Sequence, residues 1–112
     1  MSDEKRTIGW VKFWRPTDDW YTLEEGDRAK YLKDFHRAVE EAEAAGAELL
    51  GVYKCRGQSE WLSFEVWEFP DIEQLMEFTE ALDRIGHYQY FKEDRTVGRK
   101  YDRAGSRSSW VI

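Results

Sequence analysis

The clearest pattern in the chain lies in residues 61–82, where the apolar spacing changes from every second residue to every third or fourth. The first part, residues 61–69, predicts a β-strand. Pro70 then stops the strand, and Asp71 is placed to cap a helix that Gly86 ends. This stretch therefore predicts a strand, a sharp turn and an amphipathic helix in succession.

The other elements follow from the same rules. They are a strand over residues 7–15, a helix over 22–45 opened by a Thr22/Glu25 capping box, a strand over 47–55 and a weaker strand over 95–101. A short aromatic segment, residues 87–91, precedes the last strand. The order β-α-β-β-α-β predicts an α+β, ferredoxin-like fold with a four-stranded antiparallel sheet and two helices on one face. We expect one domain over residues 7–101, with a flexible tail at 1–6 and a polar tail at 102–112.

Each predicted strand has one simple apolar face and one face that mixes aromatic with polar side chains. We expect the simple face to pack beneath the helices; it consists of Val11, Phe13, Leu50, Val52, Leu62, Phe64 and Val66. The mixed face then holds Trp10, Lys12, Trp14, Leu49, Tyr53, Cys55, Trp61, Ser63, Glu65 and Trp67. Burying each large apolar side chain contributes roughly 1.5–3 kcal/mol. A second copy of the sheet would cover this face, so we expect a homodimer.

Composition narrows the function classes. A chain of 112 residues with a net charge of −6 is a poor candidate for binding nucleic acid. The single cysteine fits a reducing compartment, and no apolar run reaches the length of a membrane span. The charged N-terminus does not read as a signal peptide, so the expected location is cytoplasmic. Aromatic residues make up 16% of the chain, six of them Trp.

The element order and the aromatic second face resemble the dimeric α+β barrel superfamily over about residues 7–101. The segment FEVWEFPDIEQLMEFTEAL carries much of this resemblance. The superfamily includes antibiotic-biosynthesis monooxygenases, several haem-handling enzymes and muconolactone isomerase-like proteins. Three further segments, WRPTDDWYTLEEGDR, YKCRGQSEW and GHYQYF, are similar to a small uncharacterised family within it. The resemblance implies the fold and a pocket between the sheet and its cover.

The polar groups of the mixed face are the candidate site. Glu65 stands among aromatic residues, where a carboxylate can serve as an acid or base near neutral pH. The alternative is that Glu65 is paired with Lys12, or bonded to Tyr53 or Arg56 across strands, because buried charges are commonly satisfied in this way. The residues expected to bind a ligand are Trp10, Lys12, Trp14, Tyr53, Cys55, Ser63, Trp67 and His87.

No pair of histidines and no Cys-x-x-Cys spacing is present, so we predict no metal site. We also predict no cofactor, with haem bound through His87 as a lesser alternative that the resemblance raises. Three functions remain open. The first is a dimer that binds a small, flat, apolar molecule and acts as a monooxygenase or isomerase without a cofactor. The second is a binding or structural dimer without turnover, and the third is a haem-binding protein. Whether the protein is an enzyme is left open.

Overall fold

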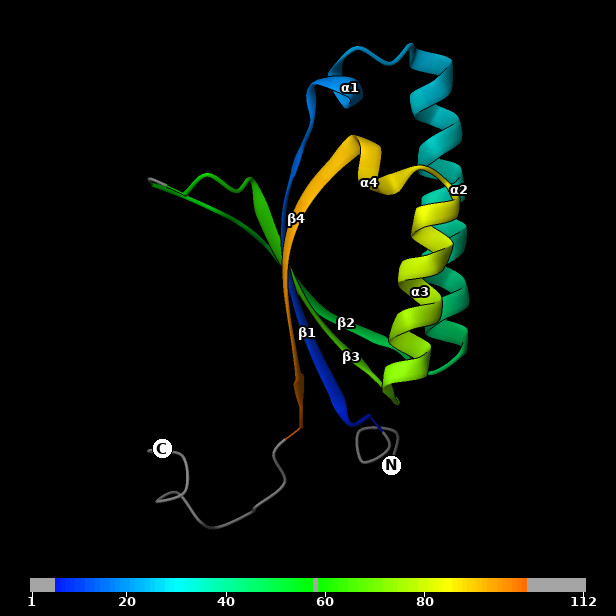
Figure 1. Ribbon diagram of the computed structural model, residues 1–112, viewed down its shortest axis with the longest axis vertical. Helices are drawn as coiled ribbons and strands as arrows, with labels where there is room; N and C mark the ends of the chain where they lie inside the picture. The colour runs from blue at the N-terminus through cyan, green and yellow to red at the C-terminus, as the bar shows by residue number, and fades with distance from the viewer. Residues whose placement is uncertain (1–5, 58, 101–112) are drawn as a thin grey trace.

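The computed structural model describes residues 6–57 and 59–100. Its elements are β1 (Ile8–Pro16), α1 (Asp18–Tyr21), α2 (Glu25–Ala44), β2 (Glu48–Lys54), β3 (Ser63–Phe69), α3 (Ile72–Arg84), α4 (His87–Tyr90) and β4 (Phe91–Arg99). The four strands form one antiparallel sheet in the order β2-β3-β1-β4. The two long helices, α2 and α3, cover one face of it (Figure 1). The predicted ferredoxin-like α+β fold is confirmed, with two one-turn helices added at one end.

The helix starts show where local sequence rules held. Asp71 caps α3, its side chain accepting a hydrogen bond from the Gln74 N–H at 2.9 Å, as predicted. The prediction of a Thr22/Glu25 capping box is wrong. Thr22 instead ends α1, donating its hydroxyl to the Asp19 carbonyl at 3.3 Å, and α2 begins at Glu25 without a side-chain cap.

The join between α2 and β2 is tight. Gly46 has a φ of 112°, and a Cβ at this position would lie 2.8 Å from the Pro70 ring. Both the positive φ and the close approach require glycine. The turn therefore fixes how the end of α2 meets the turn after β3.

The last strand begins earlier than predicted. β4 starts at Phe91, opposite Pro16, and pairs with β1 along its full length. Pairing with β1 decides this boundary, because the local sequence of residues 91–94 has little strand character of its own. As a result Glu93 lies inside the sheet, opposite Trp14.

The assignment of the two sheet faces is wrong and must be inverted. The mixed face lies beneath the helices: Trp10 and Trp67 are each 1% exposed, and Lys12 is 2% exposed. The two tryptophans pack with Phe69, Phe78 and Leu82 in the main core. Large rings bury more apolar area than valines do, which favours this face as the core. The charges on the same face pair with one another, which offsets the cost of burying them.

A β-bulge between Leu49 and Gly51 changes the alternation of β2. Beyond the bulge, Val52 pairs with Glu65 and Tyr53 pairs with Phe64. Since a one-residue shift exchanges the faces of a strand, Tyr53 lies on the opposite side of the sheet from Glu65. The prediction that Tyr53 and Glu65 share a face is therefore wrong.

The face away from the helices is apolar and open. We call it the open face and define it by Val11, Phe13, Tyr53, Phe64 and Val66. The Phe64 ring lies 5.1 Å from the Phe13 ring and 4.9 Å from the Tyr53 ring, measured between centroids. Neither α2 nor α3 lies on this side (Figure 1).

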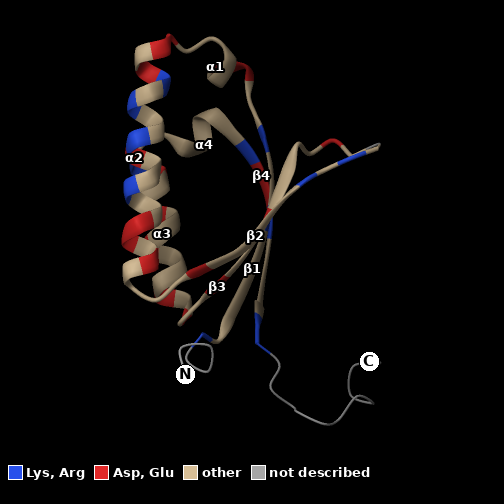
Figure 2. Cartoon of the chain, turned by 180° about the vertical axis from the view of Figure 1, so that it is seen from behind, with Lys and Arg blue, Asp and Glu red and all other residues tan. Residues whose placement is uncertain are grey.

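Charged residues are spread along α2 in the helix layer (Figure 2). Residues 1–5 and 101–112, which contain most of the two expected tails, lie outside the described residues. Arg6, the last residue of the expected N-terminal tail, is described. Arg6 is buried and forms ion pairs with Glu48 and Glu68. None of the helices in the described residues is long and apolar enough to cross a membrane.

Candidate functional site

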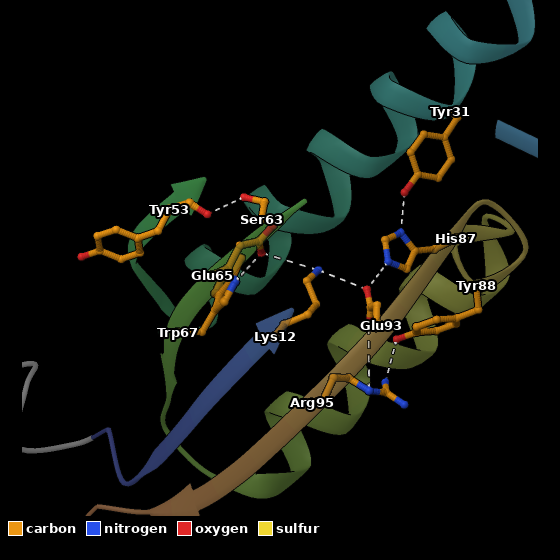
Figure 3. A network of polar contacts seen from close by, with 10 residues as sticks. All are labelled: Lys12, Tyr31, Tyr53, Ser63, Glu65, Trp67, His87, Tyr88, Glu93 and Arg95. Carbon is orange, nitrogen blue, oxygen red and sulfur yellow. Dashed lines mark hydrogen bonds and ion pairs between the residues drawn. The ribbon is translucent and has the colours of Figure 1, made fainter. Parts of the chain in front are cut away.

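A buried polar network crosses the centre of the space between sheet and helices (Figure 3). Lys12 comes from β1, Glu65 from β3 and Glu93 from β4, so three neighbouring strands supply it. His87 in α4 and Tyr31 in α2 approach from the helix side. Strand register places Glu65 directly opposite Lys12.

Lys12 holds the two carboxylates. Its Nζ lies 3.5 Å from Glu65 Oε1 and 3.4 Å from Glu93 Oε2. Glu65 Oε1 also accepts a hydrogen bond from Trp67 Nε1 at 2.9 Å. The paired alternative for Glu65 is therefore the arrangement found in the structure.

Tyr31, His87 and Glu93 form a hydrogen-bonded series. The Tyr31 hydroxyl lies 2.5 Å from His87 Nδ1, and His87 Nε2 lies 2.5 Å from Glu93 Oε2. An ionised Glu93 can only accept, so Nε2 carries a proton. With a neutral ring, Nδ1 then accepts the Tyr31 hydroxyl proton. The three side chains thus form a hydroxyl–histidine–carboxylate arrangement, in which the carboxylate orients the histidine and the histidine accepts from the hydroxyl.

The surroundings shift two pKa values in the series. Burial alone would raise the pKa of Glu93, but the His87 hydrogen bond and the Lys12 charge outweigh it and lower the pKa. Burial, followed by the negative charge of Glu93, raises the pKa of Tyr31. Burial also raises the pKa of Tyr88, beside Glu93, to about 12. Glu93 is therefore ionised and Tyr31 protonated at neutral pH.

A recess of about 150 Å³ opens beside this series. Its lining residues are Lys12, Trp14, Tyr31, Leu32, Phe35, Glu65, His87 and Phe91. An apolar cavity of roughly 150 Å³ accommodates one benzene ring. A larger groove of about 360 Å³ between α2 and α3 is lined by alanines and surface glutamates and contacts none of the network. The recess is the candidate site because it alone, of these two, meets the buried polar groups.

The structure brings together four of the predicted site residues, Lys12, Trp14, Glu65 and His87, at the recess. Three others lie on the same sheet face but within the packed interior: Trp10, Ser63 and Trp67. Ser63 donates its hydroxyl to the Tyr53 carbonyl at 2.8 Å. The remaining two are separated from the recess. Tyr53 is 52% exposed on the open face, and Cys55, half-buried and free, follows the end of β2.

Two central residues were missed. Tyr31 lies within the helix predicted over residues 22–45, where its spacing is that of an apolar position, and Glu93 lies between the segment 87–91 and the strand predicted over 95–101. The Tyr31 hydroxyl, at a position otherwise occupied by apolar side chains, was the available signal. Glu93 gave no signal, because its position depends on where β4 begins.

The sequence matches a protein family over residues 8–108, and that family is described only as a family of unknown function, DUF6616. No curated protein matches it.

The fold is similar to solved structures of chlorite dismutases. Chlorite dismutase from Candidatus Nitrospira defluvii in complex with imidazole is 16% identical, with a TM-score of 0.72 over 92% of this chain and 44% of that chain. A mutant of the same enzyme in complex with cyanide is 14% identical, with a TM-score of 0.71 over 88% of this chain and 41% of that one. A chlorite dismutase-like protein is 19% identical, with a TM-score of 0.71 over 96% of this chain and 51% of that chain. The chain thus spans about two fifths to one half of the length of these proteins, and at such identities the likeness shows the fold.

These structures correct the prediction of a protein without a cofactor. They belong to haem-binding proteins, so the absence of a cofactor can no longer be assumed. The likeness to antibiotic-biosynthesis monooxygenases within the wider superfamily finds no support among them.

The side chains described here do not accommodate haem as they lie. Both ring nitrogens of His87 are hydrogen-bonded, one to Tyr31 and one to Glu93. A recess that holds one six-membered ring is too small for a porphyrin. The donor set itself is suitable, because ligating histidines usually donate their second nitrogen to a carboxylate. Within the described residues no group of three or more His, Cys, Asp or Glu is placed to hold a metal ion.

Proposed function

The chain belongs to the DUF6616 family of unknown function, and from that premise we propose that it binds a small, flat, largely apolar molecule in the recess and transfers a proton to or from it. The observation that carries the proposal is the Tyr31–His87–Glu93 series, two members of which line the recess. Proton transfer of this kind is required in both reaction classes considered above, oxidation and isomerisation.

Tyr31 is the proposed acid. It remains protonated at neutral pH, so it can donate to an oxygen atom on the bound molecule. His87 then stands next to the developing phenolate and can share or replace its proton. Glu93 orients the ring and stabilises its charged form, and Lys12 holds Glu93 in place.

The ligand class follows from the lining. Aromatic and aliphatic side chains make up most of the wall, and its volume fits a single ring. Trp14 has a buried indole N–H without an acceptor among the described residues. A ring that carries a carbonyl or hydroxyl oxygen would satisfy this donor, which favours a monocyclic oxygenated compound over a hydrocarbon.

Glu65 stays a proposed second acid or base, on the opposite wall from Tyr31. Its Oε1 lies 3.5 Å from Lys12 Nζ and accepts a hydrogen bond from Trp67 Nε1. Glu65→Gln should abolish turnover while the fold is kept if Glu65 takes part in proton transfer. Unchanged turnover would leave it the structural role of pairing Lys12.

The proposal includes a homodimer formed through the open face. Phe13, Phe64 and Tyr53 stack into one apolar surface at the centre of the sheet, which a monomer would leave in water. A second copy related by a two-fold axis presents the same surface. The expected dimer is kept, but its interface is the face opposite to the tryptophans.

Ligand-detected NMR with a panel of monocyclic phenols, cyclic ketones and quinones tests the proposal, and the change in tryptophan fluorescence on binding, compared between wild type and Trp14→Phe, supplies a second readout. We expect some members to bind at micromolar to millimolar concentration in wild type. Tyr31→Phe should retain binding while lowering the rate of proton exchange or turnover of a bound ketone by about 100-fold or more. Tyr53→Phe, on the open face, is the matched control and should change neither. If no member of the panel binds, the proposed function is wrong.

Haem binding through His87 is the second candidate. The specific observation in its favour is a buried histidine paired with a carboxylate that is itself paired with Lys12, in a fold similar to chlorite dismutases. It requires Tyr31 to release His87 and the aromatic walls to separate. Haem titration should then give a Soret band that His87→Ala removes and that the control His36→Ala, on the exposed side of α2, leaves unchanged. A spectrum of free haem in wild type would dismiss this candidate.

A further inference from the structure

The Tyr31 hydroxyl is buried against an imidazole, and this pair can do more than donate protons. We propose that Tyr31 is a site of reversible one-electron oxidation, in which its hydroxyl proton passes to His87 Nδ1 as the electron leaves. This activity goes beyond the proposed function and needs no molecule in the recess.

The step balances within the series. One electron passes from the Tyr31 ring to a one-electron oxidant of the quinone or metal-complex class, which is reduced. The O–H bond of Tyr31 breaks and an N–H bond forms at His87 Nδ1, 2.5 Å away. The resulting imidazolium is held by Glu93 through Nε2. Return of one electron to the ring moves the proton back.

Burial explains why the two transfers are coupled. Tyr31 is 5% exposed, so neither a phenolate nor a ring radical cation would be solvated there. The raised pKa of Tyr31 reflects the cost of forming a phenolate at this buried position. Loss of electron and proton together leaves a neutral phenoxyl ring, and the positive charge moves to His87, beside a carboxylate that is already ionised.

Aromatic rings connect this site to the surface. The Trp20 ring lies 5.4 Å from the Tyr31 ring and 6.2 Å from the Tyr90 ring, measured between centroids. Trp20 is half-buried and comes from α1, at the end of the molecule. An oxidant that reaches Trp20 from solvent can therefore draw an electron from Tyr31 through adjacent rings.

Other tyrosines lack this arrangement. Tyr21 and Tyr53 are 62% and 52% exposed, and Tyr88 has its hydroxyl bonded to Arg95, which cannot accept a proton. Within residues 6–57 and 59–100, Tyr31 is the tyrosine hydrogen-bonded to an imidazole. The chain thus contains its own controls.

Flash photo-oxidation tests the proposal. Ruthenium tris-bipyridine, with a cobalt(III) ammine complex as the final electron acceptor, generates the oxidant in the presence of the full-length protein, and freeze-quench EPR detects radicals. We expect a tyrosyl signal in wild type that narrows when ring-deuterated tyrosine is incorporated. Tyr31→Phe should remove most of the signal, whereas Tyr53→Phe and Tyr21→Phe should preserve it.

Two more variants separate the parts of the proposal. His87→Gln should shorten the radical lifetime at least tenfold or lower its yield by a similar factor, because the proton acceptor is lost. Trp20→Phe should slow radical formation without changing the identity of the radical. Circular dichroism verifies that each variant is folded, and a variant that fails this check is replaced by solvent-deuterium measurements on wild type, in which formation should be slower in D₂O. A signal that survives Tyr31→Phe, or one that depends on Tyr53, would overturn the proposal.

Discussion

The two faces of the sheet differ in a way opposite to their appearance in the sequence. The open face carries the plainly apolar residues Val11, Phe13, Phe64 and Val66, and none of the helices within residues 6–57 and 59–100 covers it. The covered face carries tryptophans together with Lys12 and Glu65, and it is the core. A strand face made only of apolar residues is therefore not always the buried one. The mixed face can be buried instead when it has larger rings and when its charged side chains pair with one another.

The two faces of the sheet are also suited to different functions. The covered face combines dry packing with a polar network and a recess, which is what chemistry requires. The open face offers apolar area along β1, β3 and β2, bordered on β4 by Asp94 and Thr96, and apolar area of this kind is what association requires.

Phe69→Ala and Phe64→Ala make the same change on opposite faces of β3. Phe69 is 0% exposed, so its truncation should cost about 3–5 kcal/mol of unfolding free energy. Phe64 is half-buried in the single chain, so its truncation should cost about 1 kcal/mol in the monomer. Urea unfolding at low protein concentration measures both values. Equal losses would show that the two faces are buried to the same extent.

Glu93→Gln removes one of two carboxylates from Lys12 and replaces the charged acceptor of His87 with a neutral amide oxygen. We expect a loss of about 3 kcal/mol at neutral pH, at the lower end for a broken buried pair because Glu65 remains beside Lys12. Asp94→Asn, the exposed neighbour in β4, is the matched control and should cost far less.

The pH dependence of this variant has a definite sign. Glu93 has a lowered pKa in the folded state, so its contribution is fully present above its ordinary value of about 4.3 and is lost as pH falls through the lowered value. The stability difference between wild type and Glu93→Gln should therefore shrink below about pH 4. A difference that stayed constant down to acid unfolding would contradict the assigned ion pair.

Phe64→Glu places a charge at the centre of the open face. If two copies meet there, their affinity should fall by at least about 2 kcal/mol, or roughly thirtyfold in Kd, while each chain stays folded. Sedimentation velocity measures the change. Met76→Glu on the exposed side of α3 is the control, and an equal effect from it would place the interface elsewhere.

Tyr31→Phe removes a single hydrogen bond and should cost about 1 kcal/mol at neutral pH. The raised pKa of Tyr31 means that its folded-state contribution is complete below its ordinary value of about 10 and is lost as pH rises above it. Wild type should therefore lose stability above about pH 10 more steeply than the variant. If the unfolding free energies of wild type and variant fell equally steeply above pH 10, Tyr31 would not be buried as described.

Local sequence rules predicted the elements and their order. Asp71 and the spacing of residues 72–84 define a capped amphipathic helix without help from the rest of the chain. The antiparallel sheet followed from the order of the strands. Sequence alternation also showed correctly which residues of β1 and β3 share a face.

Non-local facts could not be predicted in this way. Which face the helices cover depends on the summed packing of both, and the burial of Lys12 and Glu65 is tolerable because they contact each other. The role of Glu93 depends on β1 extending the pairing of β4 to Phe91. Four of the eight residues that line the recess were therefore predicted, namely Lys12, Trp14, Glu65 and His87. The places of Tyr31 and Glu93 required the assembled fold.

The bulge between Leu49 and Gly51 decides which side chains β2 contributes to each face of the sheet. Leu50 is the extra residue, so its removal would restore regular alternation and leave Tyr53 opposite Phe64. Removal of a residue beyond the bulge, such as Val52, would instead place Tyr53 opposite Glu65, on the side of the helices, and Lys54 opposite Phe64. The strands β1 and β3 would keep their partners, while the open face would exchange an aromatic ring for a charged side chain.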